Sequence, residues 1–210
     1  MPSKVLPGTV VATFLWFFLG SAAWCETDAE YRQYIEVGNK LIKENPDSYR
    51  GYACRGSAYG YLKKYDLAER DLLKALSLNP SYAGIYAHLA SLYFETKRYE
   101  KSLFASRKVI ELGSEAQESY DCLLANLCKS CLYDECLKKC DEVIAKFPND
   151  ASTYFYRAIS KNELGTFDKG AVLSDLSKAH LLEPSDAGYK RVYDLARTGK
   201  SIHLIKRWNK

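Results

Sequence analysis

Two ladders of aromatic residues recur along this chain with one constant period. The first ladder holds Tyr52, Tyr86, Tyr120 and Tyr154, and the second holds Tyr65, Tyr99, Tyr133 and Phe167. Small or apolar residues occupy the intervening positions in the same register. A sequence period of about 34 residues indicates a repeat architecture, in which each copy is one supersecondary unit. The chain is therefore expected to fold as an array of similar units.

Each unit is expected to contain two amphipathic helices. In the first unit, Tyr52, Gly56 and Tyr59 are four and three positions apart, which places them on one helical face. Ala68 and Leu72 mark the inner face of a second helix in the same way. Small residues such as Gly56 allow the two helices to approach closely. The unit is therefore predicted to be a helix-turn-helix hairpin.

The pattern of residues 49–82 resembles the tetratricopeptide repeat. The resemblance implies an all-α fold, a right-handed α-solenoid of helix-turn-helix repeats. The expected units within residues 49–186 are 49–82, 83–116, 117–150 and 151–184. In the fourth unit, a two-position insertion shifts the second helix onto Val172, Leu176 and Ala179.

Shorter segments flank the four units. Residues 24–48 have apolar side chains at helical spacing, and Pro46 near their end lies one repeat period before Pro80. These residues are therefore expected to form a half repeat that covers the first face of the stack. Residues 187–210 are expected to form a closing helix followed by a basic tail. This last segment carries seven Lys and Arg against one Asp, whereas the whole chain has a net charge of only +4.

The N-terminal segment, residues 1–23, is typical of a secretory signal peptide. It carries one lysine, an apolar core from Thr9 to Leu19, and the small residues Ser21 and Ala23 before a cleavage point at Trp24. An uncleaved anchor is the main alternative, because residues 5–25 are uncharged and about 20 apolar residues span a bilayer. A lipid-modified Cys25 is a third. All three predict an exported protein (periplasmic, secreted or lumenal) or one held at a membrane.

The resemblance also implies a function. In the tetratricopeptide family, the first helices of successive units line a concave groove that holds a peptide or helix of another protein. The lining residues would be Arg50, Ser57, Ser91, Phe94, Glu95, Glu118, Asp121, Cys128, Phe155, Ile159 and Asn162. Phe94, Phe155 and Ile159 would be the apolar anchors, unless they contact a neighbouring repeat instead. The expected protein is a non-catalytic adaptor.

One subclass of the family binds the carboxylate at the end of chaperones through lysine, arginine and asparagine side chains. The matching positions here hold Ala53, Ser57, His88, Glu118 and Cys122. These residues do not suit a carboxylate, and Glu118 would repel it. A chaperone tail is therefore not the expected partner.

Five of the seven cysteines lie in the third unit, at positions 122, 128, 131, 136 and 140, and they support a rival hypothesis. Cys136 and Cys140 occupy the register of Ala68 and Leu72, which predicts simple packing. In an oxidising compartment, however, Cys128 or Cys131 could bridge to Cys136 across the turn. The alternative function is thus a thiol-redox or metal-binding protein, although tetrahedral zinc ligation fits an ordinary hairpin poorly.

Other activities have little support in the sequence. His88 shares its register with Cys54 and Cys122, but no third group orients such a pair. The chain has no phosphate-binding glycine loop, HExxH or GxSxG segment, so no catalytic residue, cofactor or metal is expected. Basic residues are not striped along the helices, which disfavours nucleic acid as a partner. Membrane contact is expected only through the N-terminal segment or the basic tail.

Overall fold

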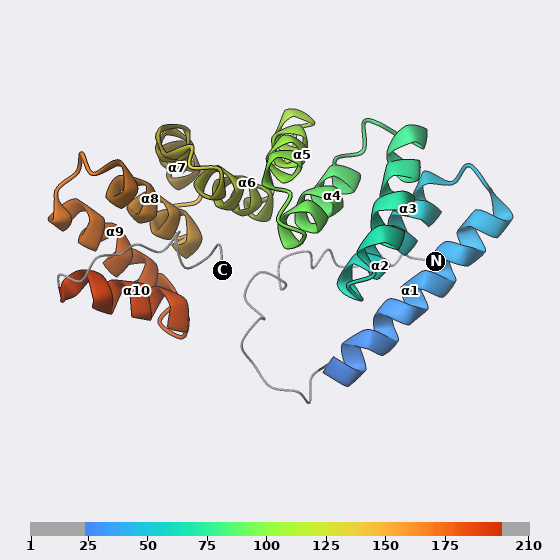
Figure 1. The fold of residues 1–210 in the computed structure, drawn as a ribbon, viewed down its shortest axis with the longest axis horizontal. Coiled ribbons are helices and arrows are strands. Elements are labelled where there is room, and N and C mark those ends of the chain that lie inside the picture. Colours follow the sequence, from blue (N-terminus) through green and yellow to red (C-terminus); the bar gives the residue numbers. More distant parts are fainter. Residues whose placement is uncertain (1–23, 199–210) are drawn as a thin grey trace, which may run out of the picture. The chain divides into compact units, whose positions relative to one another are not determined.

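The computed structural model describes residues 24–198, and this range is all-helical (Figure 1). Its helices are α1 (Trp24–Glu44), α2 (Tyr49–Tyr61), α3 (Tyr65–Leu78), α4 (Ala83–Glu95), α5 (Tyr99–Glu111), α6 (Gln117–Lys129), α7 (Tyr133–Lys146), α8 (Ala151–Leu164), α9 (Lys169–Leu182) and α10 (Ala187–Arg197). The chain divides into two compact units between Pro80 and Ser81. The first contains α1 to α3, and the second contains α4 to α10.

In the first unit, α2 packs against both α1 and α3. Glycines make the close approach of α1 and α2 possible. A Cβ atom on Gly38 would lie 2.7 Å from the Cβ of Arg55, and one on Gly51 would lie 2.8 Å from Ile42 Cγ1. A larger residue at either glycine would force the two helices apart. Gly51 also lies in the first turn of α2, and its backbone N–H donates to the N-cap hydroxyl of Ser48.

The second unit consists of the hairpins α4/α5, α6/α7 and α8/α9, followed by α10 on α9. Its core is continuous from α5 to α10. The fully buried side chains at its centre include Leu124, Leu127, Leu176 and Val143. Val172, Leu176 and Ala179 of α9 are all buried, so the shifted register expected for the second helix of the last hairpin is confirmed.

The tight turn inside each hairpin has the same backbone geometry. Lys63, Lys97, Cys131 and Gly165 follow one another at the repeat period, and all have a positive φ, between 57° and 66°. This left-handed conformation is unfavourable for residues with a Cβ atom. Only the last hairpin has a glycine at this position.

Substituting Gly165 with alanine is therefore expected to destabilise the second unit by about 1 kcal/mol. The cost comes from the backbone alone, because an added Cβ would meet no atom within 4 Å. Asparagine tolerates the left-handed region, so Gly165→Asn should cost less. Urea unfolding of the two variants beside the wild type measures the difference, and equal stability of all three would contradict the assignment.

Several segments of the sequence analysis lie outside the described residues, namely the signal peptide at 1–23, nearly all of the alternative anchor at 5–25, and the tail from 199 to 210. Within residues 24–198, none of the helices combines the length and apolar character needed to cross a bilayer.

Candidate partner-binding surface

The first helices of the three hairpins in the second unit lie next to one another, because α6 packs against both α4 and α8. Residues three or four apart along these helices share one face. Six residues of the expected groove remain partly or fully exposed on this face: Ser91, Phe94, Glu95, Glu118, Asp121 and Asn162. We call these six residues the A-helix face. It combines one large apolar side chain with polar and acidic ones.

Phe94 is the apolar member of this surface. It is partly buried at the C-terminal end of α4, and its ring packs edge-on against that of Tyr99, with the centroids 5.7 Å apart. Glu95 next to it is exposed. Phe94 can therefore offer part of its ring to a partner without leaving its intramolecular contact.

Three residues expected to line the groove are instead in the core, which corrects the sequence-based assignment. Phe155, Ile159 and Cys128 are only 5%, 3% and 1% exposed. The ring of Phe155 packs on that of Tyr189 from the closing helix α10, with centroids 4.9 Å apart. Ile159 belongs to the same core cluster as Val192 of α10. The closing helix thus covers α8 at Phe155, whereas Cys128 is buried against α7 and α8, with its sulfur 3.4 Å from that of Cys136.

The two expected groove residues of the first unit lie on α2 and are engaged locally. The guanidinium Nε of Arg50 donates to the hydroxyl of Tyr49 at 3.2 Å. The hydroxyl of Ser57 donates to the carbonyl of Cys54 at 2.9 Å. Arg50 is exposed and Ser57 is partly buried.

An acidic pair lies at the N-terminal ends of α6 and α8. Asp150 caps α8, accepting a hydrogen bond from the Ser152 backbone N–H at 3.2 Å. The Ser152 hydroxyl contacts the carboxylates of both Asp150 and Asp121. Burial, and secondly the charge of Asp150, raise the pKa of Asp121 to about 7. The Asp121 side chain therefore changes its charge near neutral pH.

The opposite end of α6 is basic. Lys129 lies 5.9 Å from the centroid of the Tyr99 ring, close enough for a cation–π contact. Burial, and secondly the charge of Lys97, lower its pKa to about 8. Acidic groups near the N-terminus and a cation near the C-terminus both complement the helix dipole of α6. The first helix of the third hairpin thus presents opposite charges at its two ends.

The cysteines of the third hairpin are free thiols in the structure. Cys136 and Cys140 are fully buried, so the expectation that they point inward is confirmed. Cys131 lies exposed on the turn. Among residues 24–198 there is no cluster of three or more His, Cys, Asp or Glu side chains that could hold a metal ion.

His88 and Cys122, which share a register in the sequence, have separate environments. Burial lowers the pKa of His88 to about 4, so its imidazole is neutral at physiological pH. The sulfur of Cys122 lies 3.4 Å from the Ser106 hydroxyl. Burial raises the pKa of the Cys122 thiol, which is the opposite of what a nucleophilic thiol needs.

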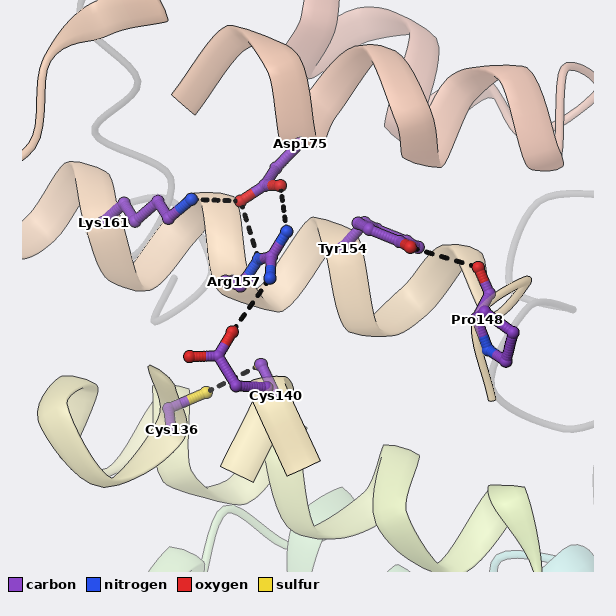
Figure 2. A network of polar contacts seen from close by, with 8 residues as sticks. Cys136, Cys140, Pro148, Tyr154, Arg157, Lys161 and Asp175 are labelled. Carbon is purple, nitrogen blue, oxygen red and sulfur yellow. Dashed lines mark hydrogen bonds and ion pairs between the residues drawn. The ribbon is translucent and has the colours of Figure 1, made fainter. Parts of the chain in front are cut away.

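The sequence analysis missed two buried ion pairs. Arg55 on α2 makes a bidentate contact with Asp71 on α3, with Nε to Oδ2 at 2.6 Å and Nη2 to Oδ1 at 3.1 Å. Arg157 on α8 makes the same contact with Asp175 on α9, at 3.0 and 2.6 Å (Figure 2). Lys161 also reaches Asp175, at 2.8 Å.

The same arginines also contact the preceding helix. Arg55 donates to Asn39 of α1 at 2.8 Å, and Arg157 donates to Asp141 of α7 at 2.9 Å. Arg55 and Arg157 are three repeat lengths apart, as are Asn39 and Asp141. This spacing of three repeats was the sequence signal from which the shared ion pairs could have been predicted. The matching contacts show that α1 packs against α2 in the same way as α7, the second helix of its hairpin, packs against α8.

Comparison with known proteins supports these repeats. Residues 49–82 and 83–112 match the tetratricopeptide repeat model. Small glutamine-rich tetratricopeptide repeat-containing protein 2 of Saccharomyces cerevisiae is 33% identical over 91 residues, which cover 43% of this chain and 26% of that protein. Hsp70-Hsp90 organizing protein 3 of Arabidopsis thaliana is 24% identical over 94 residues, covering 45% of this chain and 17% of that protein. The matches thus span about a quarter or less of these relatives.

Solved structures share the fold over a larger part of the chain. The crystal structure of YrrB, described as a TPR protein with an unusual peptide-binding site, has a TM-score of 0.66 and 19% identity, covering 78% of this chain and 84% of that one. A crystal structure of MamA has a TM-score of 0.66 and 18% identity, covering 82% and 99%. The chain therefore shares the all-α, helix-turn-helix solenoid fold of these structures, and residues 49–112 within it match the tetratricopeptide repeat.

Proposed function

We propose that the protein is a non-catalytic adaptor whose A-helix face binds a peptide or helix of another protein. The main support for this proposal is that α4, α6 and α8 lie side by side. This placement leaves Phe94, Asn162 and acidic side chains accessible together. A part-buried aromatic ring beside polar groups is a typical centre for a protein interface. The names of the similar proteins, a tetratricopeptide repeat-containing protein and an Hsp70-Hsp90 organizing protein, also support a protein partner.

The charges of the surface restrict the partner. Glu95, Glu118 and Asp121 are all acidic, whereas Lys129 lies at the far end of α6. A partner segment with a basic residue that approaches Glu118 and Asp121 would be attracted electrostatically. A C-terminal carboxylate would be repelled there, so chaperone tails are not the proposed ligand.

The proposed adaptor acts outside the cytoplasm or at a membrane. This part rests on the sequence of residues 1–25, with its apolar core and small residues before Trp24. Expression of the full chain with a C-terminal tag, followed by fractionation and N-terminal sequencing, tests it. A mature chain that begins at Trp24 supports export with cleavage, whereas an uncleaved chain in the soluble cytoplasmic fraction would refute it.

The binding surface is tested with two matched phenylalanine substitutions. Phe94 belongs to the A-helix face. Phe104 is 60% exposed and lies on α5, the second helix of the same hairpin, outside that face. Phe94→Ala is expected to weaken capture of the partner at least tenfold, a loss of about 1.4 kcal/mol or more, whereas Phe104→Ala should leave it unchanged. The measurement is quantitative affinity capture from native extract, with circular dichroism melts showing that both variants remain folded.

The reverse outcome would assign the interface to the other side of the repeats. If Phe104→Ala abolishes capture and Phe94→Ala does not, the A-helix face is not the binding surface. Capture that is unchanged in both variants but lost on adding reductant would favour the rival hypothesis of thiol chemistry in the third hairpin.

A further inference from the structure

Three buried sulfur atoms meet between the two helices of the third hairpin. The sulfurs of Cys128 on α6 and Cys136 on α7 are 3.4 Å apart, and those of Cys136 and Cys140 are 4.0 Å apart. Figure 2 marks the contact between Cys136 and Cys140 with a dashed line. All three residues are at most 1% exposed. Cys128 also lies 3.6 Å from the hydroxyl of Ser160 on α8. This arrangement brings two thiols from different helices into van der Waals contact.

Geometry selects one pair from the three. Cys136 and Cys140 stand at positions i and i+4 of one helix, where Cβ atoms are about 5–6 Å apart, whereas a disulfide needs about 3.5–4.5 Å. Their bridge would distort α7. Cys131 is exposed on the turn, and no sulfur contact joins it to Cys136 in the described structure. Cys128 and Cys136 face each other across the hairpin without these obstacles.

We propose that Cys128 and Cys136 form a disulfide that covalently joins α6 to α7 when the chain meets a disulfide-type oxidant. The bond needs the two sulfurs to close from 3.4 Å to about 2.05 Å, a change that side-chain rotation on neighbouring helices can supply. Of the two pairings left open by the sequence, the structure therefore favours Cys128 with Cys136. The inference is independent of the proposed binding surface.

The reaction is a thiol–disulfide exchange with a small-molecule disulfide such as oxidised glutathione. The Cys136 thiolate attacks one sulfur of the oxidant, forming a mixed disulfide and releasing one glutathione thiolate. The Cys128 thiolate then attacks the Cys136 sulfur and releases the second. Two protein thiols lose two electrons to the oxidant, and their two protons pass to the released thiolates. The protein disulfide and two reduced glutathione molecules result.

The surroundings of Cys136 support its role as the first nucleophile. Hydrogen bonds from the thiols of Cys128 and then Cys140 lower the pKa of Cys136, while burial opposes this. The same contact with Cys136 raises the pKa of Cys128. Because both sulfurs are buried, the oxidant reaches them before the hairpin has closed or during its local opening.

The test is peptide mapping of the purified full chain after incubation with oxidised glutathione. Trypsin separates the two cysteines, because Cys128 lies in the peptide 109–129 and Cys136 in the peptide 130–138. In the oxidised, denatured chain, Cys128 and Cys136 should both fail to react with maleimide, whereas both should react in the reduced chain. Mass spectrometry should show peptide 109–129 linked to peptide 130–138.

Variants that copy the other hairpins assign the link to particular residues. Cys136→Ala introduces the residue found at the matching position 68, and Cys131→Lys introduces the residue found at positions 63 and 97. The link should persist in Cys122→Ser and in Cys131→Lys, where the new lysine is a trypsin site and Cys136 therefore lies in peptide 132–138, and it should disappear in Cys136→Ala. A link that survives Cys136→Ala would overturn the proposal. Full maleimide labelling of Cys128 and Cys136, under conditions that attach glutathione to Cys131, would overturn it as well.

Discussion

Replacement of Arg55 by leucine is expected to destabilise the first unit by about 3–5 kcal/mol, because it leaves Asp71 buried without its bidentate partner. Asp71 has a side-chain exposure of 3%, and the other cation near it is the largely exposed Arg70, whose Nε lies 3.8 Å from the carboxylate. A buried carboxylate that loses its main counter-charge keeps its full desolvation penalty. Urea unfolding followed by circular dichroism measures the loss.

The chain itself supplies the control for this prediction. At the positions of Arg55 and Asp71, the second hairpin carries Leu89 and Ala105, both buried. The double variant Arg55→Leu/Asp71→Ala copies that apolar pair and should recover most of the stability lost by Arg55→Leu alone. If the double variant is less stable than the single one, Asp71 stabilises the unit by contacts other than the ion pair.

Asp121→Asn is expected to stabilise the protein above pH 7 by about 1–3 kcal/mol. Burial and the nearby Asp150 raise the pKa of Asp121 from its ordinary value of 3.8 to about 7. Between these two values the folded chain holds a proton at this residue that the unfolded chain has released. Stability therefore falls as the pH rises from about 4 to 7, and the full penalty persists above pH 7.

Asparagine removes this ionisation while keeping the shape of the side chain and its ability to accept a hydrogen bond from Ser152. The variant should therefore show a smaller loss of stability between pH 5 and pH 8 than the wild type. Glu95→Gln, an exposed change on the same face, should leave the pH dependence unaltered. If Asp121→Asn is less stable than the wild type at pH 8, the charged carboxylate is stabilising and the interpretation is wrong.

The repeats were predictable because their signal is periodic. Aromatic residues at a constant period, with small residues between them, specify hairpins from local spacing alone. The buried positions of α9 followed from the same logic once the shift in register was recognised. Cys136 and Cys140 were placed in the core for the same reason, since their register is that of Ala68 and Leu72.

The groove residues could be predicted only in part, because exposure depends on what covers a helix. The register correctly puts Phe155 and Ile159 on the inner side of α8, but it carries no information on the packing of Tyr189 and α10 over them. The two Arg–Asp pairs were missed because a charged residue at a core position contradicts the apolar pattern. Only the offset of three repeats between Arg55 and Arg157 reveals that the position is shared.

The most direct test of the central claim is site-specific photo-crosslinking in cells. A photoreactive amino acid is introduced singly at Ser91 and Asn162 on the A-helix face, and at Phe104 and Leu181 on second repeat helices, where the side chains are 60% and 73% exposed. The account predicts that Ser91 and Asn162 crosslink to the same partner protein and that Phe104 and Leu181 do not. Crosslinks confined to Phe104 and Leu181 would contradict it.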